Sequence, residues 1–345
     1  MNRIGMMLWA VLVVALLALA PVAADAITIP SLPGGAADAG ALAKYMPKDA
    51  TVVVAFNVAR LKEAGAIDRI ETLLGEEIFE ELEAMGIDLK KDVSQAMLGF
   101  VVNPGEDEPE TYMAMAGDLL SEADFVKRYE EEEGEKPESK TVAGKNVYDI
   151  DGAVELCFLP GIMLLVPTEE DIGADITKML GGETDSLLGN ATLVALMKDV
   201  NTKASIWAIA SLSEEIREAM AEEADEDAPF DVSTFKSVAG SFDYTEKILL
   251  NAVLGFTEEE APTKLAELIN TEIKGMADQI AEMMPDLAKL MKAIEAKASG
   301  TNATITMNID RETFDAAFEG VIEMMLGGMV GGGMVEIEEE EEVEW

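Results

Sequence analysis

The order of strands and helices is the feature that most constrains the fold of this chain, because the order runs through twice. In the first half, a β-branched strand at 51–56 leads into an amphipathic helix, and further strands follow at 96–102 and 112–116. The second half repeats this order with few identical residues. The aligned segments are Ala204–Ala208 with Ala50–Val54, Val238–Phe242 with Met97–Val101, Leu249–Gly255 with Tyr112–Gly117, and Thr304–Ile309 with the closing strands of the first half. This matching order predicts an internal duplication.

Short turns join several of the expected strands. Pro160–Gly161 is a type II turn pair, and it separates a strand at 154–159 from one at 162–166. Residues 121–124 read S-x-x-D, which is typical of a helix start, and the apolar Phe125 follows. Turns this short predict antiparallel hairpins, since parallel neighbours need long crossover connections.

These hairpin groups, with helices between them, predict an α+β fold. We expect two related lobes of mostly antiparallel sheet with helices packed on one face, at 45–185 and 186–326. The lobes either meet along an interface or share one continuous sheet. A doubly wound parallel sheet is the less favoured alternative.

The first 26 residues predict a secretory signal peptide. Arg3 gives a positive start, residues 6–20 are apolar, and Ala24–Ala26 fits an A-x-A cleavage site. This apolar stretch is short for a membrane span, so we expect cleavage after Ala26 in preference to an uncleaved anchor. The prediction is a soluble bacterial protein of the periplasm or the cell exterior, with no stable membrane insertion after cleavage.

Two segments flank the expected lobes. Residues 27–44 are rich in Pro, Gly and Ala and predict a linker. Residues 327–345 predict a Gly/Met-rich hinge followed by an acidic tail. We interpret the tail as a solubilising terminus, with a tether for a basic partner or for calcium as the alternative.

The charge balance excludes several functions. The chain has 68 Asp and Glu against 25 Lys and Arg, a formal net charge of −43, and no His. So negative a chain repels nucleic acid, and the missing imidazole removes the commonest general base and metal ligand. The single cysteine, Cys157, lies in an apolar run, which predicts a buried structural thiol and not a nucleophile.

No complete catalytic or cofactor motif is present in the sequence. Residues 233–236 read S-x-x-K, as in penicillin-interacting enzymes, but the partner motifs of those enzymes are missing. We therefore expect no enzyme activity and no cofactor, and we interpret Ser233 to Lys236 as a loop that leads into the strand at 238. A hydrolase that uses paired carboxylates remains an alternative.

A divalent cation site is a second alternative. Residues 146–155 suggest a calcium loop, but the spacing fails, so a turn at Asp151–Gly152 between two strands fits better. The run 222–227 concentrates carboxylates, and its members Asp225, Glu226 and Asp227 are the candidate Ca²⁺ ligands. No spacing rule is met there, so a solvated loop is the simpler interpretation.

The segment 263–297 contains several methionines. Its apolar residues follow helical spacing from Leu265 to Ile294, with an interruption at Pro285, which we expect to end or kink the helix. Thioethers bind Cu(I), but this spacing favours core filling or an adaptable apolar surface.

Residues 46–61 read MPKDATVVVAFNVARL, and this opening resembles uncharacterised exported bacterial proteins with two α+β lobes. The resemblance implies no activity and no site residues. Together these features predict a soluble exported cell-envelope protein with a non-enzymatic binding or structural role, and an apolar ligand or a partner helix held between the lobes is one form of that role.

Overall fold

The computed structural model describes residues 39–318, apart from 68–87, 89, 104–108, 151, 153, 168–171, 183 and 224–230. The predicted signal peptide, most of the predicted linker and the predicted acidic tail lie outside the described residues. Residues 39–44 of that linker form part of a 3-10 helix in which Leu42 and Ala43 are buried, so the packed body begins before residue 45.

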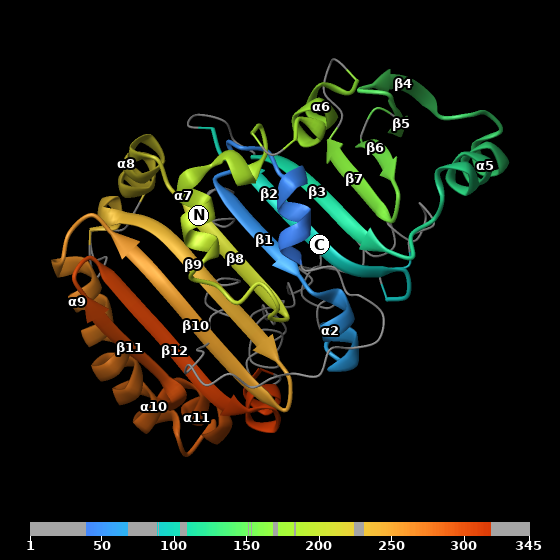
Figure 1. The fold of residues 1–345 in the computed structure, drawn as a ribbon. Coiled ribbons are helices and arrows are strands. Elements are labelled where there is room, and N and C mark those ends of the chain that lie inside the picture. The colour runs from blue at the N-terminus through green and yellow to red at the C-terminus, as the bar shows by residue number, and fades with distance from the viewer. Residues whose placement is uncertain are drawn as a thin grey trace, which may run out of the picture.

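The centre of the molecule is one 12-stranded sheet in which every neighbouring pair is antiparallel (Figure 1). The strand order is β11-β12-β10-β9-β8-β1-β2-β3-β7-β6-β5-β4. The first half supplies β1 (Val52–Phe56), β2 (Val93–Val101), β3 (Glu110–Gly117), β4 (Glu138–Val142), β5 (Lys145–Ile150), β6 (Val154–Leu159) and β7 (Ile162–Pro167). The second half supplies β8 (Ile206–Ser211), β9 (Phe235–Tyr244), β10 (Lys247–Phe256), β11 (Ile294–Ser299) and β12 (Asn302–Asp310).

The two halves have the same topology. The order β8-β9-β10-β12-β11 of the second half matches β1-β2-β3-β7-β6 of the first, which adds β5 and β4 at its outer end. The first strands of the halves, β1 and β8, are adjacent and antiparallel, with Val54 opposite Ala208. The predicted α+β fold of two related halves is therefore confirmed, and of the two arrangements left open the molecule adopts the single continuous sheet. The residue at which one half ends stays a prediction.

Short helices connect and cover the strands. They are η1 (Ala39–Tyr45), α2 (Val58–Glu63), α5 (Glu122–Glu133), α6 (Ala174–Leu180), η2 (Leu187–Gly189), α7 (Ala191–Met197), α8 (Glu214–Glu223), η3 (Val232–Thr234), α9 (Glu260–Glu267), the π-helical turn η4 (Leu268–Ile273), α10 (Lys274–Ile280) and α11 (Pro285–Ala293), and residues 311–318 are also helical. Pro285 starts α11 at a position where a missing N–H costs nothing. Ser121 caps α5, as predicted, since its Oγ accepts the N–H of Asp124 at 3.2 Å. Among the described residues, no helix combines the length and the apolarity that a bilayer crossing needs.

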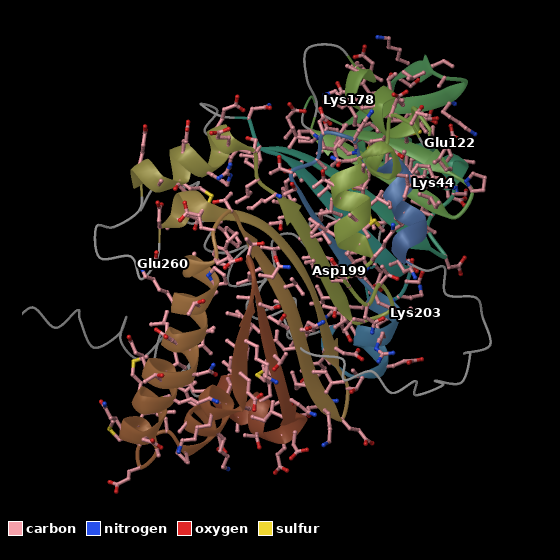
Figure 2. The ribbon with its side chains drawn as sticks, turned by 60° about the vertical axis from the view of Figure 1, so that its left-hand side comes forward. Lys44, Glu122, Lys178, Asp199, Lys203 and Glu260 are labelled. Carbon is pink, nitrogen blue, oxygen red and sulfur yellow. The ribbon has the colours of Figure 1, made fainter. Side chains whose placement is uncertain are left out.

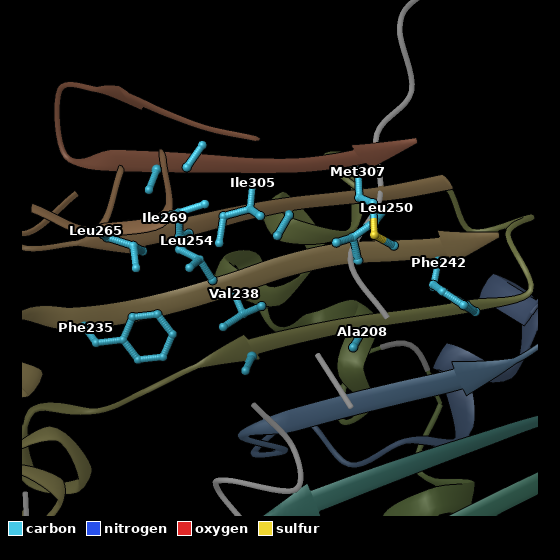
Figure 3. Close-up of a cluster of buried hydrophobic side chains, with 14 of the residues drawn as sticks. Ala208, Phe235, Val238, Phe242, Leu250, Leu254, Leu265, Ile269, Ile305 and Met307 are labelled. Atoms are coloured by element: carbon cyan, nitrogen blue, oxygen red, sulfur yellow. The ribbon is translucent and has the colours of Figure 1, made fainter. Parts of the chain in front are cut away.

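The hydrophobic core lies on both faces of the sheet. On one face, Phe242, Leu250 and Ile305 of the second half pack against Leu265 and Ile269 of the helical layer (Figure 3). Side chains of α2 and α8 join the same cluster, so this face carries helices from both halves. On the other face η1, α6 and α7 form a second layer over the middle and the first half of the sheet. The prediction that helices cover one face alone was therefore wrong, because strands such as β1 bury apolar residues on both of their faces.

Candidate functional site

Four polar side chains meet where α6 packs on β3, and we call them the Lys178 cluster: Glu110, Tyr112, Asp175 and Lys178. The Lys178 Nζ lies 2.7 Å from Asp175 Oδ1, 3.2 Å from Glu110 Oε2 and 3.0 Å from the Tyr112 hydroxyl. The Tyr112 hydroxyl donates to Glu110 Oε2 at 2.5 Å and lies 3.0 Å from Asp175 Oδ1. The Tyr112 hydroxyl has only one proton and donates it to Glu110. The hydroxyl and Asp175 are therefore bridged by Lys178, whose ammonium group donates to both.

Local sequence spacing explains this geometry. Glu110 and Tyr112 are two residues apart on β3, so they share one face of the sheet. Asp175 and Lys178 are three apart on α6 and face the same way, with the acid in the first turn and the base in the last, as the helix dipole favours. Gly173, at φ 87, lets the chain enter α6.

Three groups of the Lys178 cluster, Glu110, Tyr112 and Lys178, have pKa values shifted further from neutral pH. Burial, with the hydrogen bond to Glu110, raises the pKa of Tyr112. Burial opposes the charge on Lys178, but hydrogen bonds to Asp175, Tyr112 and Glu110 outweigh it and raise the pKa of Lys178. Burial likewise opposes the charge on Glu110, yet its bonds from Tyr112 and Lys178 hold the pKa of Glu110 below its usual value. General acid–base catalysis needs a group that exchanges its proton near the working pH, and these three groups do not.

A similar arrangement fixes the helix at 311–318. The Tyr244 hydroxyl donates to Asp315 Oδ1 at 2.7 Å, and Arg311 Nε lies 3.5 Å from Asp315 Oδ2. The Arg311 guanidinium lies 4.8 Å from the centre of the Tyr244 ring, as Lys178 Nζ lies 5.6 Å from that of Tyr112. Each half therefore fastens its closing helix with a tyrosine, an aspartate and a cation.

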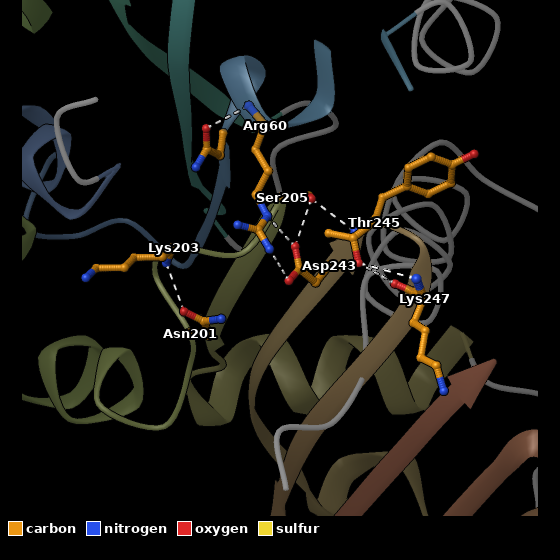
Figure 4. Close-up of polar contacts among 9 residues, drawn as sticks. Arg60, Asn201, Lys203, Ser205, Asp243, Thr245 and Lys247 are labelled. Atoms are coloured by element: carbon orange, nitrogen blue, oxygen red, sulfur yellow. Dashed lines mark hydrogen bonds and ion pairs between the residues drawn. The ribbon is translucent and has the colours of Figure 1, made fainter. Parts of the chain in front are cut away.

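An ion pair links the two halves beside the β1–β8 pair. Arg60 of α2 donates from Nε and Nη2 to the two oxygens of Asp243 at 2.6 and 2.5 Å (Figure 4). Ser205 Oγ donates to Asp243 Oδ1 at 3.1 Å and accepts the Tyr244 N–H at 3.0 Å. The Arg60 and Asp243 side chains are only 22% and 14% exposed, so this bidentate bond is held in place.

A hollow of about 470 Å³ opens at one end of the first half, beside the start of α5. Its lining divides about evenly between apolar and polar surface. The apolar lining includes Leu119, Leu120, Phe158, Leu159 and Ile162, and the polar lining includes Glu122, Lys145 and Asn146. Two tight turns frame it: Ala143–Gly144, with φ 49 and 76, and Pro160–Gly161, where Gly161 has the positive φ of 69 that the predicted type II turn requires.

The rim of the hollow is ordered by hydrogen bonds. Glu122 Oε1 accepts from Asn146 Nδ2 at 2.8 Å and from the Tyr148 hydroxyl at 2.7 Å. Burial, together with the bond to Glu122, raises the pKa of Tyr148 to about 12. Lys178 and Glu122 both lie in the first half, far from Glu260 at the start of α9 (Figure 2).

The residues singled out in the sequence occupy other places. Cys157 is buried, and burial raises the pKa of its thiol to about 11, as expected of a structural cysteine. Ser233 and Lys236 do not share a helical turn, because η3 ends at Thr234 and Lys236 lies exposed on β9. The predicted turn at 151–152 is supported at Gly152, whose φ is 71 and which lies between β5 and β6.

The candidate cation ligands Asp225, Glu226 and Asp227 lie outside the described residues. Within the part of the chain that the structure describes, no three acidic or cysteine side chains gather to hold a metal ion. In the Lys178 cluster, the two neighbouring carboxylates of Glu110 and Asp175 are both paired with the ammonium group of Lys178.

The methionine-rich segment is divided between core and surface. Leu265 and Ile269 are buried under the helical layer, whereas Met276 is 48% exposed and Met283 is 77% exposed. The sequence pattern predicted an apolar stripe, but it did not distinguish these two exposed methionines from the buried members.

Sequence reasoning missed the Lys178 cluster and the Arg60–Asp243 pair. The spacing of Asp175 and Lys178 was the available local signal. Their partner Tyr112 is 63 residues from Asp175, and Asp243 is 183 residues from Arg60.

Comparisons with known proteins give only a weak likeness. No family model matches the sequence, and a search of curated proteins finds no match. Among solved structures, crystal form III of TP0453 has a TM-score of 0.48 at 11% identity, covering 81% of this chain and 97% of that chain. Crystal form I of TP0453 has a TM-score of 0.45 at 11% identity, covering 84% of this chain and 98% of that one. These scores support no conclusion about function, and the resemblance of residues 46–61 to exported bacterial proteins stays a prediction.

Proposed function

We propose that this chain is an exported, non-enzymatic binding protein that takes a small ligand with an apolar body into the hollow of its first half. The observation that carries the proposal is the hollow itself, about 470 Å³, which combines a group of large apolar side chains with polar ones in nearly equal surface. Small-molecule sites typically measure roughly 300–1,000 Å³ and combine apolar walls with a few placed polar groups. The export part of the proposal rests on the signal-like residues 1–26.

The lining limits the chemistry of the ligand. Leu120, Phe158 and Ile162 favour an aliphatic or aromatic body. Asn146 and Lys145 offer hydrogen-bond donors at the rim, while Glu122 and the net charge of −43 oppose a strongly anionic ligand. We therefore expect a neutral molecule with one polar end.

A binding role fits the described titratable groups better than a catalytic one does. The carboxylates of the Lys178 cluster, Glu110 and Asp175, share one ammonium group, and the pKa of Tyr112 and that of Lys178 are both raised. A carboxylate-based hydrolase needs one carboxyl group held protonated near neutral pH, whereas the pKa of Glu110 is lowered. A hydrolytic activity lost on Glu110→Gln or Asp175→Asn would overturn the non-enzymatic proposal.

Fluorescence titration with N-phenylnaphthylamine, a neutral apolar dye, tests the site. We expect saturable binding by the purified chain, weakened about tenfold or more by Leu120→Trp, which fills the hollow. Leu188→Trp is the matched control, because Leu188 is 38% exposed and does not line the hollow. The absence of saturable binding, or equal affinity in both variants, would contradict the proposal.

A second candidate is a partner helix bound at the exposed methionines of the helical layer. Met276 and Met283 are large apolar side chains with 48% and 77% exposure, and flexible thioethers suit adaptable protein contacts. A photoreactive residue at 283 should crosslink one partner, and Met276→Glu should abolish that crosslink. The same residue placed at the exposed Lys127 of α5 should not crosslink it. A crosslink that persists in Met276→Glu would count against this surface.

Calcium binding by Asp225, Glu226 and Asp227 stays a prediction. Calorimetry with Ca²⁺ in physiological salt tests it, and an absence of heat would dispose of it.

A further inference from the structure

Strand β11 lies at one end of the sheet, and its outer edge is occupied by a side chain. Asn270 of η4 donates from Nδ2 to the Ala296 carbonyl at 2.7 Å, and its Oδ1 accepts the Ala296 N–H at 3.2 Å. These two bonds are the pair that a neighbouring antiparallel strand would make with Ala296. The Asn270 amide therefore takes the place of the next strand.

The π-helical turn explains why Asn270 reaches this edge. A π-helical turn holds an extra residue within an otherwise α-helical run, and such turns recur at functional sites. Ile269 of η4 is buried against the sheet, while the adjacent Asn270 is itself exposed and points to β11. Among the hydrogen bonds of the described residues, Asn270 is the one residue of the turn that bonds the edge of β11 as a strand would.

We propose that Asn270 closes the edge of β11 against pairing with β11 of a second copy of this chain. Exposed edge strands are templates for such pairing, and proteins block them in specific ways. If the side chain is withdrawn, the freed Ala296 N–H and carbonyl pair with the same groups of the second copy.

The charges on β11 favour a second copy as the occupant. Pairing centred on Ala296 places Glu295 opposite Lys297 of the second copy and Lys297 opposite its Glu295. Both residues are exposed and lie on the face of β11 opposite the buried Ala296. The strand is thus complementary to itself in one register. The net charge of −43 opposes association, so the pairing should show itself only when salt screens it.

Light scattering on purified chains in molar NaCl tests the proposal. We expect the wild type to be a monomer and Asn270→Ala to double the measured mass as concentration rises. Adding Lys297→Glu to Asn270→Ala should restore the monomer, because like charges then face each other. Adding both Glu295→Lys and Lys297→Glu should restore the dimer. Asn308→Ala, which removes an exposed Asn from β12, is the control and should stay monomeric.

Amide hydrogen exchange tests the closed edge in the wild-type chain and needs no variant. The N–H groups of Ala296 and Ala298 both point away from β12, but only that of Ala296 bonds Asn270. We expect slow exchange at Ala296 and fast exchange at Ala298. Equal exchange at the two positions, a folded Asn270→Ala that stays monomeric, or a dimer indifferent to Lys297→Glu would each overturn the proposal.

Discussion

Each half closes with a helix, but the two closing helices pack on opposite faces of the sheet. Helix α6 packs with Ile176 and Met179 on the face of η1 and α7, whereas the helix at 311–318 packs Phe314 on the face of α9 and α11. The equivalent strands β7 and β12 explain the difference: β7 buries consecutive residues from Met163 to Val166, while the burial of β12 alternates. A sheet that is apolar on both faces accepts a second helical layer, and an alternating one leaves a face to solvent.

Truncating one side chain on this face should give the largest difference between the halves in the free energy of unfolding. Leu164 of β7 is fully buried under the second helical layer, and Thr306 of the equivalent β12 lies half-buried on the same face of the sheet. We expect Leu164→Ala to lower the free energy of unfolding by about 2–5 kcal/mol. Thr306→Ala should lower it by less than about 1 kcal/mol. Urea denaturation measures both, and similar losses would break the comparison of the two faces.

The two closing helices should differ in their dependence on the cation. Lys178→Met leaves two carboxylates, Glu110 and the buried Asp175, without their cation, so we expect a loss of about 2–3 kcal/mol, which allows for screening at the half-exposed Lys178. Arg311→Met leaves only Asp315, and a loss of about 1 kcal/mol is expected.

Adding Glu110→Gln to Lys178→Met sharpens that test. Removing one of the two uncompensated charges should recover part of the lost stability. If the double variant is less stable than Lys178→Met alone, carboxylate repulsion is not the cause. Thermal unfolding at pH 7 is a suitable measurement.

The contact between the halves should show measurable coupling. A double-mutant cycle with Arg60→Met and Asp243→Asn should give about 1–2 kcal/mol, because the bond is bidentate and largely buried. The pair Glu260–Lys264 on the exposed side of α9 is the matched control and should give less than about 0.5 kcal/mol. Equal couplings would mean that this ion pair joins the halves no more strongly than an exposed surface pair would.

The smallest expected effect is a change in how steeply the free energy of unfolding falls with pH in the alkaline range. The pKa of Tyr148 is 10.0 in the unfolded chain and about 12 in the fold, so its neutral form is favoured by folding. Its contribution to stability is complete below pH 10 and declines as the pH rises to about 12. Tyr148→Phe should flatten the fall in unfolding free energy over this window. An unchanged slope would show that Tyr148 titrates normally in the fold.

Much of the fold was predictable from short-range patterns. Most strands of both halves, the turn at Pro160–Gly161 and the cap at Ser121 depend on residues adjacent in sequence, and so does the burial of Cys157 within an apolar run. Strands β4 and β11 were not predicted, and β11 begins at Ile294, inside the segment that the apolar spacing indicated to be helical. The Lys178 cluster was not predictable in this way. Whether Tyr112 meets Lys178 depends on which face of β3 is covered by α6, and both faces of that strand are apolar enough to be covered.

The sequence by itself determined most of the order of strands and helices, the antiparallel hairpins and the exclusion of histidine chemistry, since each follows from local propensity or composition. The tertiary structure alone decided that the halves join as one sheet through β1 and β8, that Arg60 meets Asp243, and that Asn270 closes the edge at Ala296. Those contacts join residues that are 26 to 183 positions apart. They form only once register and helix placement bring the side chains within hydrogen-bond range, because bonds of about 3 Å carry no signature in the sequence around either partner.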